Sequence, residues 1–147
     1  MSEFERKRIE PPETELTRPF WEASREGKLV LQWCRPCDAV VHYPRECCPK
    51  CLASDLEWRE SSGRGEVYAF SVMHRAANPL MKVPYVVALV DLPEGARLMT
   101  NIVGCAPSEV AVGMPVELEW EALSDGRAVP LFRPDASRRS RVEQEES

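Results

Sequence analysis

Four of the six cysteines occur as two C-x-x-C pairs, and this spacing predicts a metal site. Cys34 pairs with Cys37 and Cys48 with Cys51, with ten residues between the pairs. Each pair encloses a proline, and a tight turn of this kind points two thiolates toward one centre. Two turns complete a tetrahedron that suits Zn²⁺, although the residues alone leave iron open. Four cysteines leave no open coordination position, so we predict a structural metal.

Two other side chains could compete as ligands. Cys47 is adjacent to Cys48, but only Cys48 completes the second C-x-x-C. His42 lies between the pairs, and its commoner interpretation is a packed or surface residue. The pairs could instead be redox dithiols, but no βαβ pattern of the thioredoxin kind surrounds them. The metal would hold a segment of roughly 30 residues that is too small for its own core.

The elements around the cysteines are short. Thr17 as N-cap and Gly27 after the last turn predict a helix near residues 18–26. A helix this short must dock, either on the chain's own ribbon or on another subunit. Strands are predicted at three segments that flank the pairs, namely 28–33, 40–44 and 55–60. The sequence SSGRG at 61–65 predicts a flexible joint and a domain boundary.

The second half of the chain reads as five strands. These are predicted at 66–74, 85–92, 96–103, 116–121 and 128–132. Residues 85–92 are almost continuously apolar, as expected of a strand buried on both faces, and PEG at 93–95 predicts a hairpin. Five short strands with a longer connection at 104–115 favour a Greek-key barrel such as an OB-fold over a five-stranded sandwich fragment. The expected fold class is mainly β.

Composition and charge exclude several classes of protein. The chain has 147 residues, 44% of them hydrophobic, and a formal net charge of −5, which excludes a wholly disordered chain. No apolar run approaches the roughly 20 residues of a membrane span, and no signal peptide is visible, so a cytoplasmic location is expected. Residues 64–132 carry five basic and eight acidic side chains, which is unfavourable for a nucleic-acid groove.

Residues with catalytic potential are isolated outside the cysteine pairs. Cys105 has no histidine near it in sequence and is expected to be a packed residue. His74 ends a predicted strand beside Arg75, and its commoner interpretation is again structural. The chain has no phosphate-binding glycine loop and no G-x-S-x-G motif. The sequence therefore predicts no self-sufficient active site.

The order of several segments carries a family resemblance. They are PFWEASREGKLVLQWCRPC, YPRECCPKC, LEWRESSGRGEVYAFSVMHR, PYVVALVDLPEGARLMTNIVG and VGMPVELEW. Over residues 17–133 the chain resembles the DUF35 family, acyl-CoA-associated OB-fold proteins with a rubredoxin-like zinc ribbon. The expected organisation is a mobile N-terminal segment (1–16), a docking helix (17–27), a zinc ribbon (28–62), an OB-fold domain (63–133) and a disordered tail (134–147).

The resemblance implies an accessory subunit, non-catalytic or co-catalytic, in a hetero-oligomer. Such proteins partner thiolase-like enzymes, including the lipid-transfer-protein type, and help to form their acyl-CoA site. The implied chemistry is retro-aldol cleavage, condensation or acyl transfer on CoA esters. The implied cofactor is structural Zn²⁺ on Cys34, Cys37, Cys48 and Cys51, with acyl-CoA as a ligand shared with the partner.

Two sets of residues are expected to serve these contacts. Aromatic and apolar side chains are favoured interface anchors, and the expected partner-binding residues are Phe20, Trp21, Leu31, Trp33, Tyr43 and Trp58. Bases are scarce in the acidic second half, and Arg75, Lys82 and Arg97 are expected near the CoA phosphates. His74 is expected with them as a further contact to acyl-CoA.

Three other functions remain open at this point. Zinc ribbons and OB-folds also bind single-stranded nucleic acid, which the acidic balance of the second half disfavours. An autonomous enzyme would have to use Cys105 or His74. An assembly factor that never touches CoA would leave the partner's rate unchanged.

Overall fold

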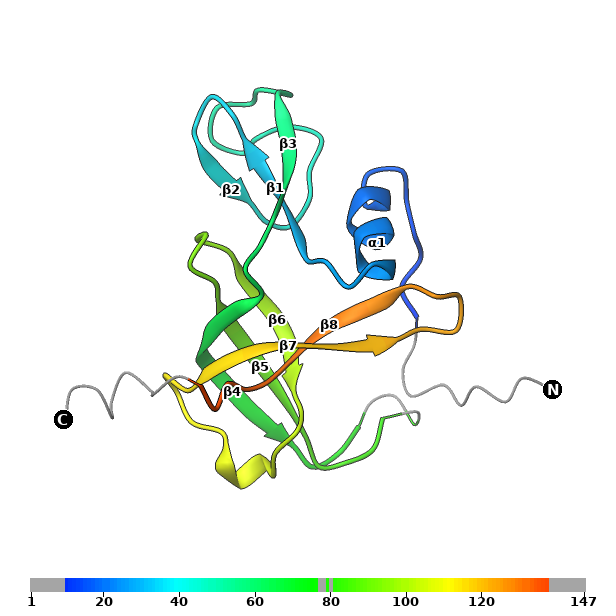
Figure 1. Cartoon of the computed structure of the whole chain (residues 1–147), viewed down its shortest axis with the longest axis vertical. Coiled ribbons are helices and arrows are strands. Elements are labelled where there is room, and N and C mark those ends of the chain that lie inside the picture. The colour runs from blue at the N-terminus through cyan, green and yellow to red at the C-terminus, as the bar shows by residue number, and fades with distance from the viewer. Residues whose placement is uncertain (1–9, 77–78, 80, 138–147) are drawn as a thin grey trace.

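A computed structural model describes residues 10–76, 79 and 81–137. The fold is mainly β, as predicted, with a three-stranded ribbon stacked against a five-stranded barrel (Figure 1). One short helix, α1 (Arg18–Arg25), lies beside the ribbon and over one end of the barrel. No helix in the described residues has the length and apolar character that a membrane crossing requires.

The ribbon is an antiparallel sheet in the order β2-β1-β3. Its strands are β1 (Val30–Cys34), β2 (Ala39–Val41) and β3 (Leu56–Glu60), close to the three predicted segments. The central strand β1 ends at Cys34, so the sheet itself positions the first cysteine.

The second half forms a closed barrel in the order β4-β5-β6-β8-β7, which confirms the barrel and excludes the sandwich fragment. Its elements are β4 (Arg64–Met73), β5 (Tyr85–Asp91), β6 (Arg97–Ile102), the 3₁₀ turn η1 (Pro107–Glu109), β7 (Pro115–Ala122) and β8 (Ala128–Pro134). The predicted hairpin is the antiparallel pair β5–β6.

The expectation that β5 is buried on both faces is wrong. Val86, Ala88 and Val90 are buried, whereas the residues that alternate with them are only partly covered. A closed barrel has one interior, so only every second side chain of a strand enters the core. The outward-facing residues of β5 are also mostly apolar, so the sequence does not show the alternation between buried and partly exposed positions.

The ribbon and the barrel share one hydrophobic core. Leu29 and Leu31, at the base of the ribbon, belong to the same buried cluster as Val90 and Phe132 of the barrel. The turn between β5 and β6 also reaches the ribbon, because a Cβ on Gly95 would lie 3.4 Å from Val40 Cγ1. The two modules therefore stabilise each other through buried apolar surface.

The segment at 61–65 is not the flexible joint that its composition predicts. The Ser61 amide donates to the Leu29 carbonyl at 2.7 Å. One carboxylate oxygen of Glu94 accepts both the Ser61 hydroxyl and the Ser62 amide at 2.9 Å. Gly63 and Gly65 are buried in this segment. These glycines serve close packing, which composition cannot distinguish from flexibility.

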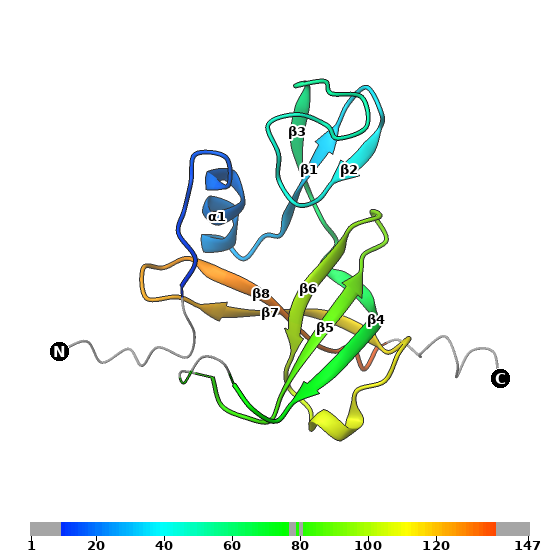
Figure 2. The ribbon, with the colours of Figure 1, turned by 180° about the vertical axis from the view of Figure 1, so that it is seen from behind.

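Helix α1 docks on its own chain. Trp21 is 7% exposed and lies under the Arg127 guanidinium, whose carbon is 4.7 Å from the ring centroid. Trp120 Nε1 donates to the Gly27 carbonyl at 3.1 Å, just after the helix. Figures 1 and 2 show α1 beside β1 and over the β7–β8 hairpin. Thr17 is the N-cap residue, but its hydroxyl makes no bond to the helix.

The expected terminal segments extend too far into the chain. Glu10 accepts the Ser124 amide and hydroxyl, and Arg127 donates to the Pro11 carbonyl at 2.8 Å, so residues from 10 onward are anchored. At the other end Asp135 is buried after β8 and accepts the Ser137 amide at 3.1 Å. The rest of the expected mobile segment and tail, 1–9 and 138–147, lies outside the described residues.

We expect Ser24→Ala to destabilise the fold by about 1–3 kcal/mol. The buried Ser24 hydroxyl accepts the Ala128 amide at 3.2 Å and donates to the Trp21 carbonyl at 2.6 Å. The substitution leaves a buried amide of β8 without an acceptor, which costs more than the loss of an exposed bond. Urea unfolding of the metal-loaded chain measures the change.

The control for this prediction is Ser54→Ala, which removes an exposed hydroxyl in the ribbon. We expect it to change the free energy of unfolding by no more than about 0.5 kcal/mol. Equal losses in the two variants would contradict the role assigned to Ser24.

Candidate functional site

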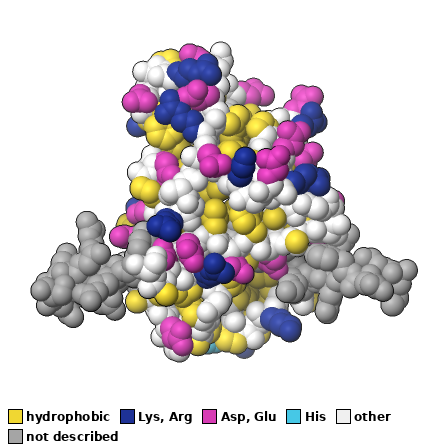
Figure 3. All heavy atoms as spheres, viewed as in Figure 1, with side chains coloured by type: hydrophobic (Ala, Val, Ile, Leu, Met, Phe, Trp, Pro, Cys, Tyr) yellow, Lys and Arg dark blue, Asp and Glu magenta, His cyan; other side chains and the backbone are white. Residues whose placement is uncertain are grey.

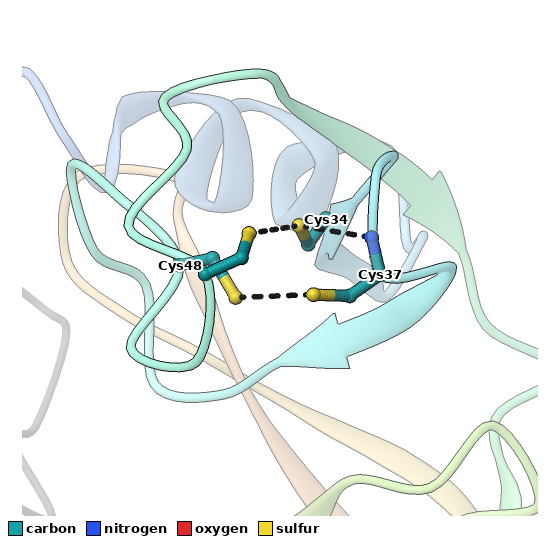
Figure 4. A group of neighbouring side chains, drawn as sticks. Cys34, Cys37 and Cys48 are labelled. Atoms are coloured by element: carbon teal, nitrogen blue, oxygen red, sulfur yellow. Dashed lines mark hydrogen bonds between the residues drawn. The ribbon is translucent and has the colours of Figure 1, made fainter.

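The structure brings the four predicted cysteines together. Their sulfur atoms all lie within 4.8 Å of one another, in a group that contains Cys34, Cys37, Cys48 and Cys51. The Sγ atoms of Cys34 and Cys51 are 3.6 Å apart, and those of Cys37 and Cys48 are 3.9 Å apart. Figure 4 shows the labelled side chains pointing toward one another from the two turns. Among the described residues, neither Cys47 nor His42 belongs to this group.

Each turn directs backbone amides at its first sulfur. The Cys37 amide donates to Cys34 Sγ at 3.5 Å, and the Lys50 amide donates to Cys48 Sγ at 3.4 Å. Such bonds stabilise thiolates, which are the form that binds a metal. The prolines of CRPC and CPKC help to close the turns that place these amides.

The four thiols strongly influence one another's ionisation. Backbone amides of Cys51 and Lys50 lower the pKa of Cys48 to about 6. The neighbouring thiols of Cys51 and Cys34 raise the pKa of Cys37 to about 12, and burial raises the pKa of Cys34. Four sulfurs this close carry four negative charges only beside a cation, so the donor set fits a divalent metal such as Zn²⁺.

The core of the ribbon beyond the cysteines is small. Its buried cluster consists of Cys34, Val41 and Cys48, with Cys37 and Leu56 packed against it. Three of these five side chains are themselves metal-ligand candidates. A cluster of this size cannot offset the entropy of ordering the two turns, which explains why the segment needs a metal.

His42 is a half-buried residue of the ribbon. Its Nε2 atom is buried and has no hydrogen-bond partner among the described residues, and burial lowers the pKa of its imidazole. The ring contacts Tyr43 with centroids 4.0 Å apart. His42 is thus placed as a packing residue of the ribbon, the commoner of its two interpretations.

The expected partner-binding residues divide into two groups. Trp21 and Leu31, the latter 3% exposed, lie in the chain's own core and cannot reach a partner while α1 stays docked. Phe20 packs partly on the same core. Tyr43 is 58% exposed and available.

Trp33 and Trp58 are half-buried and lie on opposite faces of the ribbon. Trp58 pairs with Gln32 across the sheet, and neighbouring residues of one strand alternate between faces. The Arg59 guanidinium lies 4.6 Å from the Trp33 ring centroid. A single flat partner surface could not cover both tryptophans.

The expected CoA contacts also divide. His74, Arg75 and Lys82 lie in the connection between β4 and β5, next to the paired residues Met73 and Tyr85. Arg97 begins β6 at the other end of the sheet, roughly 20 Å away along β5 at about 3.4 Å per residue. The four basic side chains therefore do not form one phosphate site.

Arg97 already has partners of its own. Its guanidinium donates to both carboxylate oxygens of Asp91, at 2.6 and 3.1 Å. It also stacks on Tyr68, with 3.4 Å from the guanidinium carbon to the ring centroid. The Asp91 hydrogen bonds raise the pKa of Arg97 further. A phosphate at this position would have to compete with a bidentate carboxylate.

Sequence reasoning missed the exposed Leu52. It directly follows the second C-x-x-C, is 73% exposed, and has a φ of +63°. An apolar residue inside an otherwise polar turn was the available signal, but the sequence does not reveal the left-handed backbone. Glu94, which joins the ribbon to the barrel, was also missed because its partners are 32 and 33 residues away.

Comparison with known proteins identifies the family. The model of the ChsH2 rubredoxin-like zinc ribbon domain matches residues 21–57, and that of the ChsH2 C-terminal OB-fold domain matches residues 58–121. A DUF35 domain-containing scaffold protein of Methanocaldococcus jannaschii is 40% identical over 99 residues, which cover 66% of this chain and 70% of that protein. The chain belongs to the DUF35 family.

Other similar proteins carry the name of an enzyme or of an enzyme subunit. A solved structure called Ltp2-ChsH2(DUF35) aldolase matches with a TM-score of 0.78 and 41% identity, covering 85% of this chain and 98% of that chain. The benzoylsuccinyl-CoA thiolase subunit BbsA of Thauera aromatica is 32% identical over 100 residues, which cover 67% of this chain and 68% of that protein.

A longer relative contains a similar stretch. The probable enoyl-CoA hydratase alpha subunit of Thermomonospora curvata is 45% identical over 116 residues, or 78% of this DUF35 chain. The chain spans only 36% of that protein's length. The sequence similarity therefore covers one part of a larger polypeptide in that relative.

Proposed function

We propose that this DUF35 chain is an accessory subunit that binds a thiolase-like enzyme and helps to form its acyl-CoA site. The observation that carries the proposal is the 41% identity with the DUF35 chain of an Ltp2-ChsH2 aldolase, over nearly all of that chain. The relative named as a thiolase subunit supports the same class of partner. The reaction we favour is carbon–carbon bond chemistry on a CoA ester, by retro-aldol cleavage, condensation or acyl transfer.

The ionisation of Cys105, a cysteine outside the four-sulfur group, supports the proposal that a partner supplies the active site. Burial, followed by the charge of Glu109, raises the pKa of Cys105. A protonated thiol is a poor nucleophile at neutral pH. The chain's own contribution is then a scaffold and a wall of the acyl-CoA entrance.

The proposed metal is Zn²⁺ on Cys34, Cys37, Cys48 and Cys51. The metal supplies charge neutralisation and crosslinking of the two turns, and the closed four-sulfur set holds it away from substrate. The cysteines position the ribbon, which carries Tyr43 on its surface. The proposed role of the metal in the complex is to keep this surface of the ribbon in one conformation.

For acyl-CoA we propose contacts from the connection between β4 and β5. Its basic side chains, Arg75 and Lys82, are close in sequence to His74 and lie at one end of the barrel. Lysine and arginine bind phosphate groups by charge-assisted hydrogen bonds. Arg97 is the weaker candidate because Asp91 already occupies its guanidinium.

Nucleic-acid binding is the alternative that the surface disfavours. Figure 3 shows basic and acidic side chains interspersed over one face, without a continuous basic stripe. On β7 the acidic Glu117 and Glu119 pair with a single base, Arg133. A salt-dependent mobility shift with a single-stranded oligonucleotide at physiological ionic strength would favour this alternative.

The proposal is tested by co-expression with a thiolase-like protein of the lipid-transfer-protein type from the same genome. We expect a stoichiometric complex on size exclusion, and turnover of an acyl-CoA ester at least 10-fold faster than by either chain alone. Arg75→Ala with Lys82→Ala should raise KM for the ester about 30-fold, since two phosphate contacts of about 1 kcal/mol each sum to about 2 kcal/mol.

The matched control is Arg59→Ala, which removes an equally basic side chain from the ribbon and should leave KM unchanged. Full turnover by the lone chain, or no complex with any such enzyme, would contradict the proposal. A complex whose rate equals that of the enzyme alone would favour a pure assembly factor.

A further inference from the structure

The two metal-binding turns place equivalent residues in the same unusual backbone conformation. Asp38 follows Cys37 and Leu52 follows Cys51, with φ values of +50° and +63°. A Cβ is disfavoured in this left-handed region by roughly 1–2 kcal/mol, and Asp and Asn tolerate it better than other residues with a side chain. The turns therefore provide an internal comparison between two side chains at one structural position.

Asp38 has local contacts that explain its presence. Its carboxylate accepts a hydrogen bond from Trp33 Nε1 at 3.2 Å and lies 3.8 Å from Arg59 Nη1. These bonds tie the first turn to β1 and β3, so the aspartate contributes to the ribbon. Its short polar side chain also suits the left-handed backbone.

Leu52 makes no comparable side-chain bond in the part of the chain that the structure describes. Its side chain carries no polar atom and is 73% exposed, the largest value among the exposed large hydrophobic residues of the described chain. The backbone amide of Leu52 donates to the Cys48 carbonyl at 2.8 Å, and glycine would make that bond equally well. For the free chain, glycine would relieve the strain and remove an exposed apolar group.

The surroundings of Leu52 indicate the kind of surface that it meets. Lys50 and Cys51 beside it are exposed. Three residues on, Asp55 pairs with Arg35 at 2.7 Å, and both side chains are 54% exposed. An exposed apolar residue that is close in sequence to side chains of both charges is typical of a protein–protein contact, whereas a membrane-binding surface would be mainly basic.

We propose that Leu52 is an anchor that inserts into an apolar pocket of the partner protein subunit. The inference rests on the proposed function, in which the chain is a subunit of a larger enzyme. Strained, exposed residues persist where function requires them, and here the function is binding. The occupant of this surface is a protein pocket large enough for one aliphatic side chain.

Leu52→Gly tests the anchor because we expect it to stabilise the free chain and to weaken binding to the partner. The zinc-loaded free chain should melt a few degrees higher, about 2–5 °C, because strain is removed. The Kd for the thiolase-like partner that co-elutes with the wild type should rise about 10- to 100-fold. Calorimetry on the full chains measures both quantities.

Two further variants separate backbone strain from side-chain contact. Leu52→Asn keeps a side chain that tolerates the left-handed backbone but loses the apolar contact, so it should weaken binding as much as glycine does. Asp38→Gly removes the contacts to Trp33 and Arg59 at the equivalent position. It should lower the melting temperature and leave the Kd unchanged.

The outcomes distinguish this inference from the proposed function. Wild-type affinity in Leu52→Gly, with the wild-type complex intact, overturns the anchor alone. Failure of the wild type to bind any such partner overturns both. Leu52-dependent dimerisation of the free chain, or Leu52-dependent binding to vesicles of anionic lipid, would replace the protein pocket by a second copy or a membrane.

Discussion

Cys48→Ser is expected to abolish tight metal binding and to leave the ribbon, residues 30–60, without a stable structure. Cys48 is buried beside Cys34, and the rest of the ribbon cluster offers only Val41 and Leu56 as non-ligand apolar cover. Structural zinc contributes of order 10–16 kcal/mol in zinc-finger peptides at pH 7, and in such modules this is folding free energy. Loss of one of four thiolates removes most of that contribution.

The damage should extend into the barrel. Leu29 and Leu31 share the buried cluster of Val90 and Phe132, so an unfolded ribbon exposes one side of the barrel core. Glu94 would also lose the hydrogen bonds that it accepts from Ser61 and Ser62. We therefore expect a large fall in the free energy of unfolding of the whole chain. Chelation of the wild type should reproduce it.

Elemental analysis of the purified chain measures bound metal and distinguishes zinc from iron. Amide exchange by residue shows where protection is lost. Cys47→Ser is the matched control, because Cys47 is the neighbouring thiol outside the sulfur group, and it should keep one metal per chain. Because protons compete for thiolates, metal release should increase as pH falls. A full complement of metal in Cys48→Ser would disprove the assignment.

Gly65→Ala is expected to destabilise the chain by about 2–3 kcal/mol, or to prevent folding. A Cβ at this position would lie 2.6 Å from the Asp91 carbonyl oxygen and 2.7 Å from Val90 Cγ1. Both atoms belong to β5, where the backbone is fixed by pairing with β4 and β6. Val90 is fully buried, so neither atom can move aside without disturbing the barrel.

The control for Gly65→Ala is a glycine that is constrained by its backbone conformation and not by close packing. Gly113 has a φ of +85° and open space around a built Cβ. Gly113→Ala should therefore cost only the conformational penalty, about 1–2 kcal/mol. Urea unfolding of both variants compares the two costs. A smaller loss for Gly65→Ala than for Gly113→Ala would show that β5 yields and would refute the packing argument.

Local patterns predicted most of the architecture. The cysteine spacing located the metal centre, because two short turns bring four sulfurs together with little help from the rest of the chain. The five strands of the barrel were recognisable because turn residues separate them. Closure of the barrel followed from strand number and length.

The expectations that the structure changes share a cause, which is contact between side chains that local sequence patterns do not reveal. The segment 61–65 reads as flexible until Glu94 and β5 are placed against it. Arg97 reads as a free base until Asp91 is found beside it. Trp21 and Leu31 were assigned to a partner because apolar side chains suit both a core and an interface, and only their burial distinguishes the two.

The shared core limits how members of this family can be recombined. The matches to the two family domains meet between residues 57 and 58, yet Leu29 and Leu31 lie on one side of that point and their buried neighbours on the other. A chimera cut there would join surfaces shaped for different partners. A chimera should therefore exchange the ribbon and the barrel together.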